Sequence, residues 1–86
     1  MKELEKTLKA LANRRRLAIV RHLKDNPGSS VGDIARAIKL SFKATSKHLG
    51  KLSAADILER EQKGLMMFYR VSSNARSAIK GVFSLL

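Results

Sequence analysis

Leucines recur every three or four positions in the first part of the chain, at Leu4, Leu8 and Leu11. This spacing places the three side chains on one face of a helix. Asn13 stands where a second helical pattern begins, in the position of an N-cap residue that accepts hydrogen bonds from the first turn. The apolar stripe predicted for this second helix consists of Leu17, Val20 and Leu23, with Ile19 beside it. The segment 25–29 contains Pro and Gly and has the composition of a turn.

Two further helices are predicted after this turn. Ser30 and Asp33 resemble a capping box for a short helix whose apolar face consists of Val31, Ile34, Ala35 and Ile38. Ser41 is a good cap for the next helix, predicted at about 42–55. The face expected to enter the core there consists of Phe42, Thr45, Leu49 and Leu52. Two short helices joined by so tight a link form the helix-turn-helix pattern.

The periodicity then changes from helical to extended. Residues 57–62 and 65–71 read as two strands joined by a turn at Lys63 and Gly64, which predicts a β-hairpin at about 57–71. A last helix follows, capped by Ser72 or Ser73 and carrying the apolar residues Ala75, Ala78, Ile79, Val82, Phe83 and Leu86. The fold predicted is mainly α with a β-hairpin wing: a winged helix-turn-helix in the order α-α-α-α-β-β-α, forming one domain over residues 1–86.

The charge of the chain indicates what kind of partner such a fold would bind. Lys and Arg number 18 against 7 Asp and Glu, a formal net charge of +11. This balance favours a polyanionic partner, either nucleic acid or an anionic membrane surface. There is no acidic residue from Ile34 to Ala55. Within this window Lys43, Lys47 and Lys51 are spaced by four, so they share one helix face.

The basic face of the predicted fourth helix lies opposite its apolar face and also carries Ser46. A helix of this kind fits the major groove of double-stranded DNA, with its first turns nearest the base edges. We expect Lys43, Ser46 and Lys47 to read bases there. The residues expected to hold phosphates are Lys51, Arg14, Lys63 and Arg70, with the wing on the backbone or in the minor groove. The plainer interpretation of these lysines is a solvated helix face.

Several segments resemble the ArsR-type (arsenical-resistance repressor) family. Residues 8–17 resemble its "ALADPTRLRIL" opening, residues 33–35 its "DLA" stretch, and residues 46–52 its "S-x-HL-x-x-L" stretch. The wing at 64–69 is similar too, and the match extends from about Leu4 to Ser72. The resemblance implies a winged-helix repressor that forms a homodimer through its first and last helices. The residues expected at the dimer interface are Leu4, Leu8, Leu11, Ile79, Val82, Phe83 and Leu86.

The chain departs from the family at its sensor positions. Ser30 and Gly32 stand where metal-sensing members carry Cys-x-Cys, and residues 74–86 contain neither acids nor histidines. With no cysteine anywhere and with His22 and His48 isolated in the sequence, we expect no metal and no cofactor. Asp56 stands where the family has a glycine after the recognition helix, and Asp tolerates the left-handed conformation better than most residues.

Functions other than a DNA-binding regulator fit the sequence less well. No nucleophile–base pair, phosphate-binding loop or metal cluster suggests an enzyme. A winged-helix module that binds RNA or a protein partner is the alternative, because this fold serves both. A nonspecific architectural DNA protein would insert an apolar wedge. No exposed wedge is evident in the sequence, although Met66 at the wing is a weak candidate. Without an apolar run of membrane-spanning length or a secretory signal, the chain is expected to be cytoplasmic, with no membrane partner.

Overall fold

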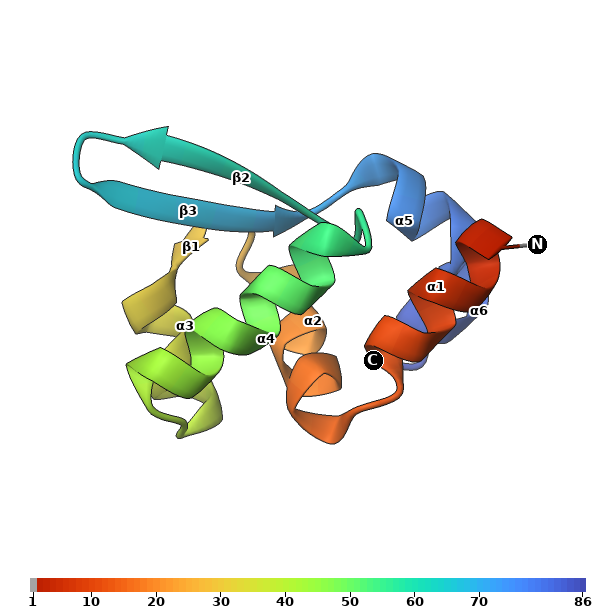
Figure 1. Ribbon diagram of the computed structural model, residues 1–86, viewed down its shortest axis with the longest axis horizontal. Coiled ribbons are helices and arrows are strands. Elements are labelled where there is room, and N and C mark those ends of the chain that lie inside the picture. Colours follow the sequence, from red (N-terminus) through yellow and green to blue (C-terminus); the bar gives the residue numbers. More distant parts are fainter. Residues whose placement is uncertain (1) are drawn as a thin grey trace.

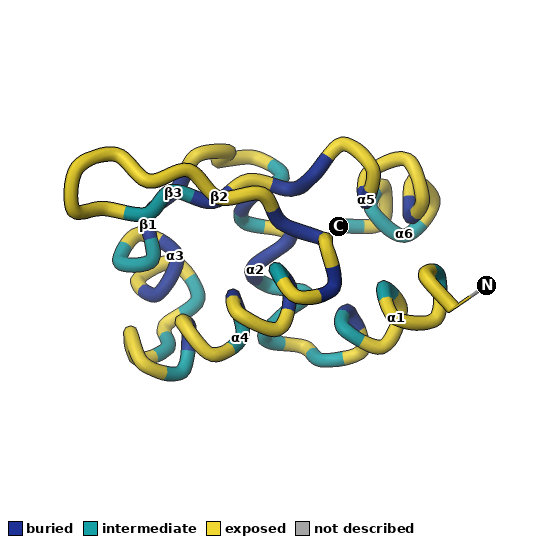
Figure 2. Tube along the Cα trace, turned by 45° about the horizontal axis from the view of Figure 1, so that its top comes forward, coloured by how far each residue is buried: buried dark blue, intermediate teal, exposed yellow. Residues whose placement is uncertain are grey.

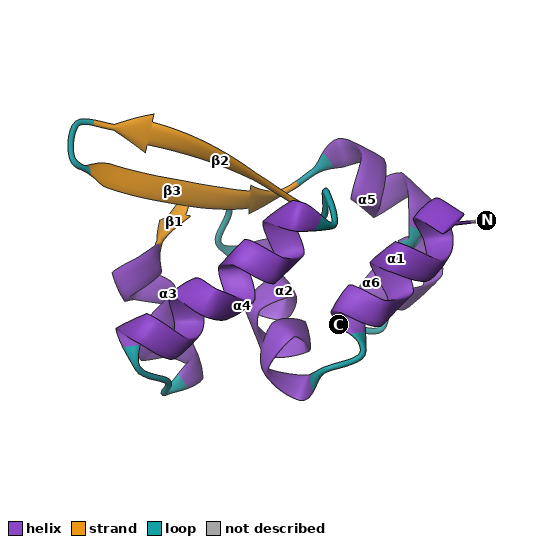
Figure 3. Cartoon of the chain, in the orientation of Figure 1, coloured by secondary structure: helices purple, strands orange, loops and turns teal. Residues whose placement is uncertain are grey.

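The computed structural model describes residues 2–86 (Figures 1 and 3). Its elements are α1 (Lys2–Leu11), α2 (Arg14–Asp25), β1 (Ser29–Ser30), α3 (Val31–Ile38), α4 (Phe42–Ala54), β2 (Leu58–Lys63), β3 (Met66–Val71), α5 (Ser73–Ala78) and α6 (Lys80–Ser84). The winged helix-turn-helix predicted from the sequence is confirmed. None of the helices within residues 2–86 is both long enough and apolar enough to cross a membrane.

Side-chain caps explain where the helices begin. The Asn13 side chain accepts hydrogen bonds from the backbone N–H groups of Arg15 and Arg16, at 2.9 and 3.1 Å. The hydroxyls of Ser30 and Ser41 each accept one from the backbone N–H three residues later, at 3.2 and 3.1 Å. Each cap satisfies a donor that the first helical turn would leave unpaired. All three were predicted from the sequence.

The wing differs from its prediction in two respects. Lys63 pairs with Met66 across the hairpin, so the turn consists of Gly64 and Leu65 rather than Lys63 and Gly64. Gly64 has φ of 63° while Leu65 has no positive φ, which is the pattern of a type II′ hairpin turn. The sheet also has a third strand, because the two-residue β1 pairs with β3 in the order β1-β3-β2. Such a short polar strand has no periodicity by which it could be predicted.

The core forms around α2, whose central turns are buried (Figure 2). Its fully buried large side chains come from α2, α3, α4 and the entry to the wing: Ile19, Val20, Leu23, Ile34, Leu49, Leu52 and Ile57. The prediction that Phe42 joins this core is wrong, because its side chain is 63% exposed. Phe42 is the first residue of α4, and at this end the helix borders an open groove of about 420 Å³ instead of packed neighbours.

The predicted last helix is divided in two. Ile79 leaves helical geometry, with φ of −118° and ψ of 30°, and separates α5 from α6. Its side chain is buried in the core with Ala75. The break therefore lets the chain turn at Ile79 while this side chain stays in the core. Asp56 has φ of 59°, so the left-handed conformation expected at this position is confirmed.

Candidate nucleic-acid interface

Helix α4 presents a basic surface on the side away from the core. Lys43, Ser46, Lys47 and Lys51 are all exposed. The opposite side of the helix is buried through Thr45, Leu49 and Leu52. No acidic residue lies on α4, so no carboxylate of this helix neutralises its three lysines. The structure thus brings together the four α4 residues predicted to contact DNA.

The start of α2 adds arginines beside this helix. Arg14 is exposed, whereas Arg15 and Arg16 are half-buried. The Arg16 side chain turns inward, where its Nε donates to the carbonyl oxygen of Ala10 and its Nη1 lies 3.5 Å from His48 Nδ1. Arg16 therefore connects α1, α2 and α4. No sequence pattern indicated this link, because Arg16 and His48 are far apart along the chain.

The pKa of His48 reflects the positive charges around it, where α2 meets α4. Burial lowers its pKa below the ordinary 6.5, and the charges of Arg16, Lys51, Arg15 and Lys47 lower it further. Four cations thus act on one half-buried imidazole of the recognition helix. A phosphate placed here would be attracted by the same four groups.

The basic residues predicted on the wing lie in different surroundings. Lys63 is exposed at the end of β2, with its Nζ 5.8 Å from the centre of the Phe68 ring. Arg70 lies nearer the base of the hairpin, where its guanidinium forms ion pairs of 2.9 Å with Glu59 and 3.7 Å with Glu61. Arg70 would have to exchange these carboxylates for a phosphate, so Lys63 is the better placed of the two to contact DNA.

Arg36 on α3, like Arg70, already has an acidic partner. It pairs with Asp33 one turn earlier on the helix. Hydrogen bonds from the Ser30 side chain and backbone hold the pKa of Asp33 below its ordinary 3.8, and the Arg36 charge adds to this effect. The carboxylate of this capping box is thereby kept ionised. The basic surface of the helix-turn-helix therefore rests on α4 rather than on α3.

The wing tip carries apolar side chains that are more exposed than the sequence pattern indicated. Leu65 is fully exposed and Met66 half so. Together with Phe42 they border the groove beside α3, which Val31 and Met67 also line. Met66, the weak candidate for an apolar wedge, is exposed, but Leu65 occupies the turn itself and is the more exposed of the two.

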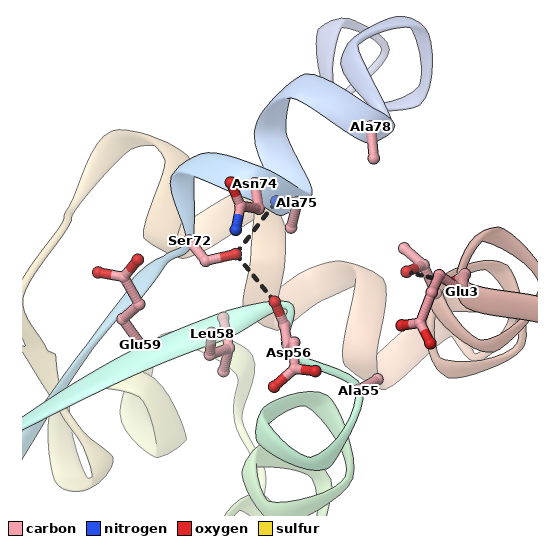
Figure 4. A pocket seen from close by; sticks show the side chains of 10 residues that line it. Glu3, Ala55, Asp56, Leu58, Glu59, Ser72, Asn74, Ala75 and Ala78 are labelled. Carbon is pink, nitrogen blue, oxygen red and sulfur yellow. Dashed lines mark hydrogen bonds between the residues drawn. The ribbon is translucent and has the colours of Figure 1, made fainter.

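Acidic side chains gather at the other end of α4. A cavity of about 410 Å³ lies there between α1, the entry to β2 and α5, and Glu3, Asp56 and Glu59 are among its lining residues (Figure 4). The Ser72 hydroxyl bridges this region by donating to the Asp56 carbonyl at 2.9 Å and accepting from the Ala75 N–H at 3.1 Å. Three of the seven acidic residues of the chain thus lie away from the first turns of α4.

The terminal helices expose part of the apolar surface predicted for a dimer. Leu8 is 45% exposed, and Leu4, Val82, Phe83 and Leu86 are half-buried. Two residues of the predicted interface are in the core of the single chain instead: Leu11 is 4% and Ile79 is 3% exposed. Their assignment to the interface is corrected, because side chains already buried have little surface left to contribute.

The remaining titratable side chains do not assemble a metal site in residues 2–86. No group of three or more His, Cys, Asp or Glu side chains in this range is close enough to hold an ion. His22 lies with its Nε2 3.2 Å from the Ser29 hydroxyl, where it connects α2 to β1.

Comparisons with known proteins agree with this geometry. A family model described as "Helix-turn-helix domain" matches residues 11–61. The chain is 37% identical to the transcriptional activator HlyU of Vibrio cholerae over 79 residues, which cover 92% of this chain and 69% of HlyU. A solved structure of that protein superposes with a TM-score of 0.85 over 98% of this chain and 91% of the HlyU chain, at 32% identity.

Two other solved structures are similar over 98% of this chain. One is the homodimeric winged helix-turn-helix DNA-binding domain Mb0332 of Mycobacterium bovis, described as a possible ArsR-family regulator, with a TM-score of 0.81 at 28% identity over 74% of that chain. The other is the transcriptional repressor PagR of Bacillus anthracis, with a TM-score of 0.82 at 27% identity over 92% of that chain.

Proposed function

The chain belongs to the ArsR type of helix-turn-helix transcriptional regulators, and from this premise we propose how it binds DNA. It is a DNA-binding regulator rather than an enzyme. The proposal is that α4 enters the major groove of double-stranded DNA while the wing tip follows the backbone or the minor groove. One observation carries it: the exposed face of α4 is basic and without acids, and it lies directly opposite the buried face.

The basic residues divide into readers and anchors in this proposal. Lys43, Ser46 and Lys47 lie in the first turns of α4, which are nearest the base edges in helix-turn-helix complexes. Lysine can donate to guanine O6 and N7, and serine can bond several base edges. The proposed phosphate anchors are Lys51, Arg14 and Lys63, with Arg70 available if it leaves its two glutamates.

Two copies of the chain are proposed to act together. The apolar side chains exposed on the terminal helices are the proposed contact: Leu4, Leu8, Val82, Phe83 and Leu86, with the exposed Leu85 beside them. Mb0332, which shares this fold, is described as homodimeric. A two-fold dimer would place two α4 helices about 34–36 Å apart, one helical turn of DNA, on a near-palindromic site.

We propose repression as the outcome of binding, in the cytoplasm and without a metal effector. A dimer bound over promoter DNA excludes polymerase from the same base pairs. Among the similar proteins, PagR is named a repressor and HlyU an activator. Transcription in vitro from a promoter containing the bound site tests the sign: repression predicts less transcript as protein is added, and a rise in transcript would make the protein an activator.

The DNA proposal is tested by selecting bound duplexes from a random DNA pool. Enrichment of a near-palindrome with half-sites one helical turn apart is expected. The selected sequence is then titrated as duplex DNA and as duplex RNA, whose major groove is too narrow for a helix. Equal binding to both, or no enrichment at all, would contradict the proposal. A variant with Lys43, Lys47 and Lys51 changed to Gln should fold, because all three side chains are exposed, and should enrich nothing.

A further inference from the structure

Phe42 is a large apolar side chain in an unexpected place. It is the first residue of α4, directly after the Ser41 cap, and 63% of it is exposed. Burial of a phenylalanine side chain favours folding, and Phe42 forgoes much of this gain. The exposed residues next to it on α4 are polar, and its apolar neighbours are Leu65 and Met66 of the wing tip, which border the same groove.

Phe42 lies on the part of α4 that is proposed to enter the groove of DNA. Residues four apart lie one above another on a helix, so Phe42, Ser46 and Gly50 form one row. This row runs between the buried side of α4 and the lysines 43, 47 and 51. Ser46 and Gly50 are small and exposed, and a Cβ added at Gly50 would meet no atom within 4 Å. Because Ser46 and Gly50 are small, this row of α4 can approach the floor of a DNA groove closely. Phe42 is the one large side chain among the three.

The flanking charges indicate what covers Phe42. Lys43 follows it directly, and Lys47 lies on the adjoining row, so an anionic partner is attracted to the same turn of the helix. This inference rests on the proposed function, in which that partner is double-stranded DNA. Base edges in the major groove offer hydrogen-bonding groups and one apolar group, the C5 methyl of thymine, which apolar side chains including phenylalanine contact.

We propose that Phe42 determines specificity by packing on the C5 methyl group of a thymine in each half-site. The lysines and Ser46 cannot recognise this group, because it has neither a donor nor an acceptor. Phe42 thus adds an apolar contact to a surface that otherwise reads bases by hydrogen bonds. Removal of one buried methyl corresponds to a decrease of about fourfold in affinity, so two half-sites together correspond to about fifteenfold.

The test removes the methyl from the DNA and the ring from the protein. Deoxyuridine, which lacks only the methyl, replaces each thymine of the selected duplex in turn, symmetrically in both half-sites. Wild-type protein should lose about fifteenfold in affinity at one thymine position. Phe42→Ala should bind the thymine duplex about as weakly as wild type binds the uracil duplex, and should not distinguish the two. Leu65→Ser, which removes the exposed leucine of the wing tip, is the control and should distinguish them as wild type does.

The outcomes separate this inference from the proposed function. Specific binding with no thymine position sensitive to uracil, or with Phe42→Ala equally sensitive, overturns the role of Phe42 and leaves DNA recognition by α4 intact. A sensitivity that disappears in Leu65→Ser but persists in Phe42→Ala would assign the contact to the wing tip, which also overturns the proposal. Failure to select any duplex is the failure of the proposed function itself. Circular dichroism of both variants checks that α4 still forms.

Discussion

The two ends of the molecule expose opposite kinds of chemistry. Around the first turns of α4 the exposed charged side chains are basic, and no acidic residue occurs between positions 34 and 55. At the terminal helices Leu8 and Leu85 are exposed, and a cavity lined in part by Glu3, Asp56 and Glu59 lies between α1 and α5. The first surface suits a polyanion, whereas the exposed leucines of the second suit another apolar surface. A small chain can thus bind DNA and pair with its own copy without one partner competing for the surface of the other.

The largest expected effect is that of salt concentration on DNA affinity, because salt screens the basic surface of α4. A dimer that neutralises about 6–10 phosphates should lose about 10³–10⁵ in DNA affinity between about 50 and 200 mM salt, because bound counterions are released from the DNA. The oligomeric state, which rests on apolar contact, should change little over the same range. Fluorescence anisotropy and light scattering at each salt concentration measure the two quantities. A nearly flat binding curve would contradict the electrostatic account of this surface.

The next largest effect is expected from a charge placed at the apolar end. Leu8→Glu puts a carboxylate into the proposed dimer contact and should yield monomers by light scattering at micromolar concentration. Tight binding to the two half-sites depends on their being linked, so affinity should fall by about 10²–10⁴. Leu65→Glu is the matched control, since it adds the same charge at an exposed leucine of the other end and should leave the dimer intact. A Leu8→Glu protein that remains dimeric would remove α1 from the interface.

Leu11→Ala should instead destabilise the single chain. Leu11 is 4% exposed in the core, and truncating a buried leucine costs about 2–5 kcal/mol. Leu65→Ala, at a fully exposed leucine, should change the free energy of unfolding by no more than about 0.5 kcal/mol. Urea titrations of both variants measure the difference. Equal stabilities would mean that Leu11 belongs to the surface and not to the core.

The contrast between Leu8 and Leu11 shows where prediction from sequence ends. Leu4, Leu8 and Leu11 share one stripe by spacing, and spacing alone cannot say how far along α1 the core extends. The same holds at the start of α4, where Phe42 has the spacing of a core residue but lies beyond the packed helices. Helix caps were predictable because they depend on residues three positions apart. The strand β1 and the Arg16–His48 contact were not, since both join segments distant in sequence.

The exposure of side chains on α4 was easier to predict from the sequence than the exposure of those on the terminal helices. Exposure of Lys43, Ser46 and Lys47 follows from periodicity, because the buried residues of α4 fix the direction of the opposite side. Arg70 shows the limit of periodicity as a guide. Its ion pairs with Glu59 and Glu61 arise from the pairing of β2 with β3, and charge counted along the sequence does not reveal them. The exposed Leu65 depends likewise on the position of the hairpin turn.

A smaller effect on DNA affinity is expected from single substitutions on the basic surface, and it should differ between base-contacting and phosphate-contacting residues. Lys47→Ala should cost about 1–3 kcal/mol of binding free energy and relax the preference at one base position in each half-site. Lys63→Ala should weaken all sequences about equally and lower the salt slope by about one for each phosphate that the protein no longer touches. Both variants are titrated against the selected duplex and a random duplex. Equal weakening of both duplexes by Lys47→Ala would make Lys47 an anchor and leave base reading to Lys43, Ser46 or DNA shape.

The smallest expected effect is the pH dependence of stability and DNA affinity that arises from His48, which lies between the core and the basic surface. Burial and the surrounding cations lower the pKa of His48, so the folded protein binds this proton less readily than the unfolded chain. The stabilising contribution is therefore complete above about pH 6.5 and disappears as the pH falls through the folded-state pKa. Asp33, whose pKa lies below 3.8, does not titrate in this range.

The urea midpoint should accordingly fall between about pH 8 and pH 5 in the wild type, and fall less in His48→Gln. DNA binding should show the opposite trend, because phosphates near α4 favour the protonated imidazole that Arg16 and the lysines disfavour. Wild-type affinity should rise as the pH falls, whereas that of His48→Gln should respond less. If the variant kept the full pH dependence of both quantities, His48 would lie outside the DNA surface, and the four cations around it would serve the fold alone.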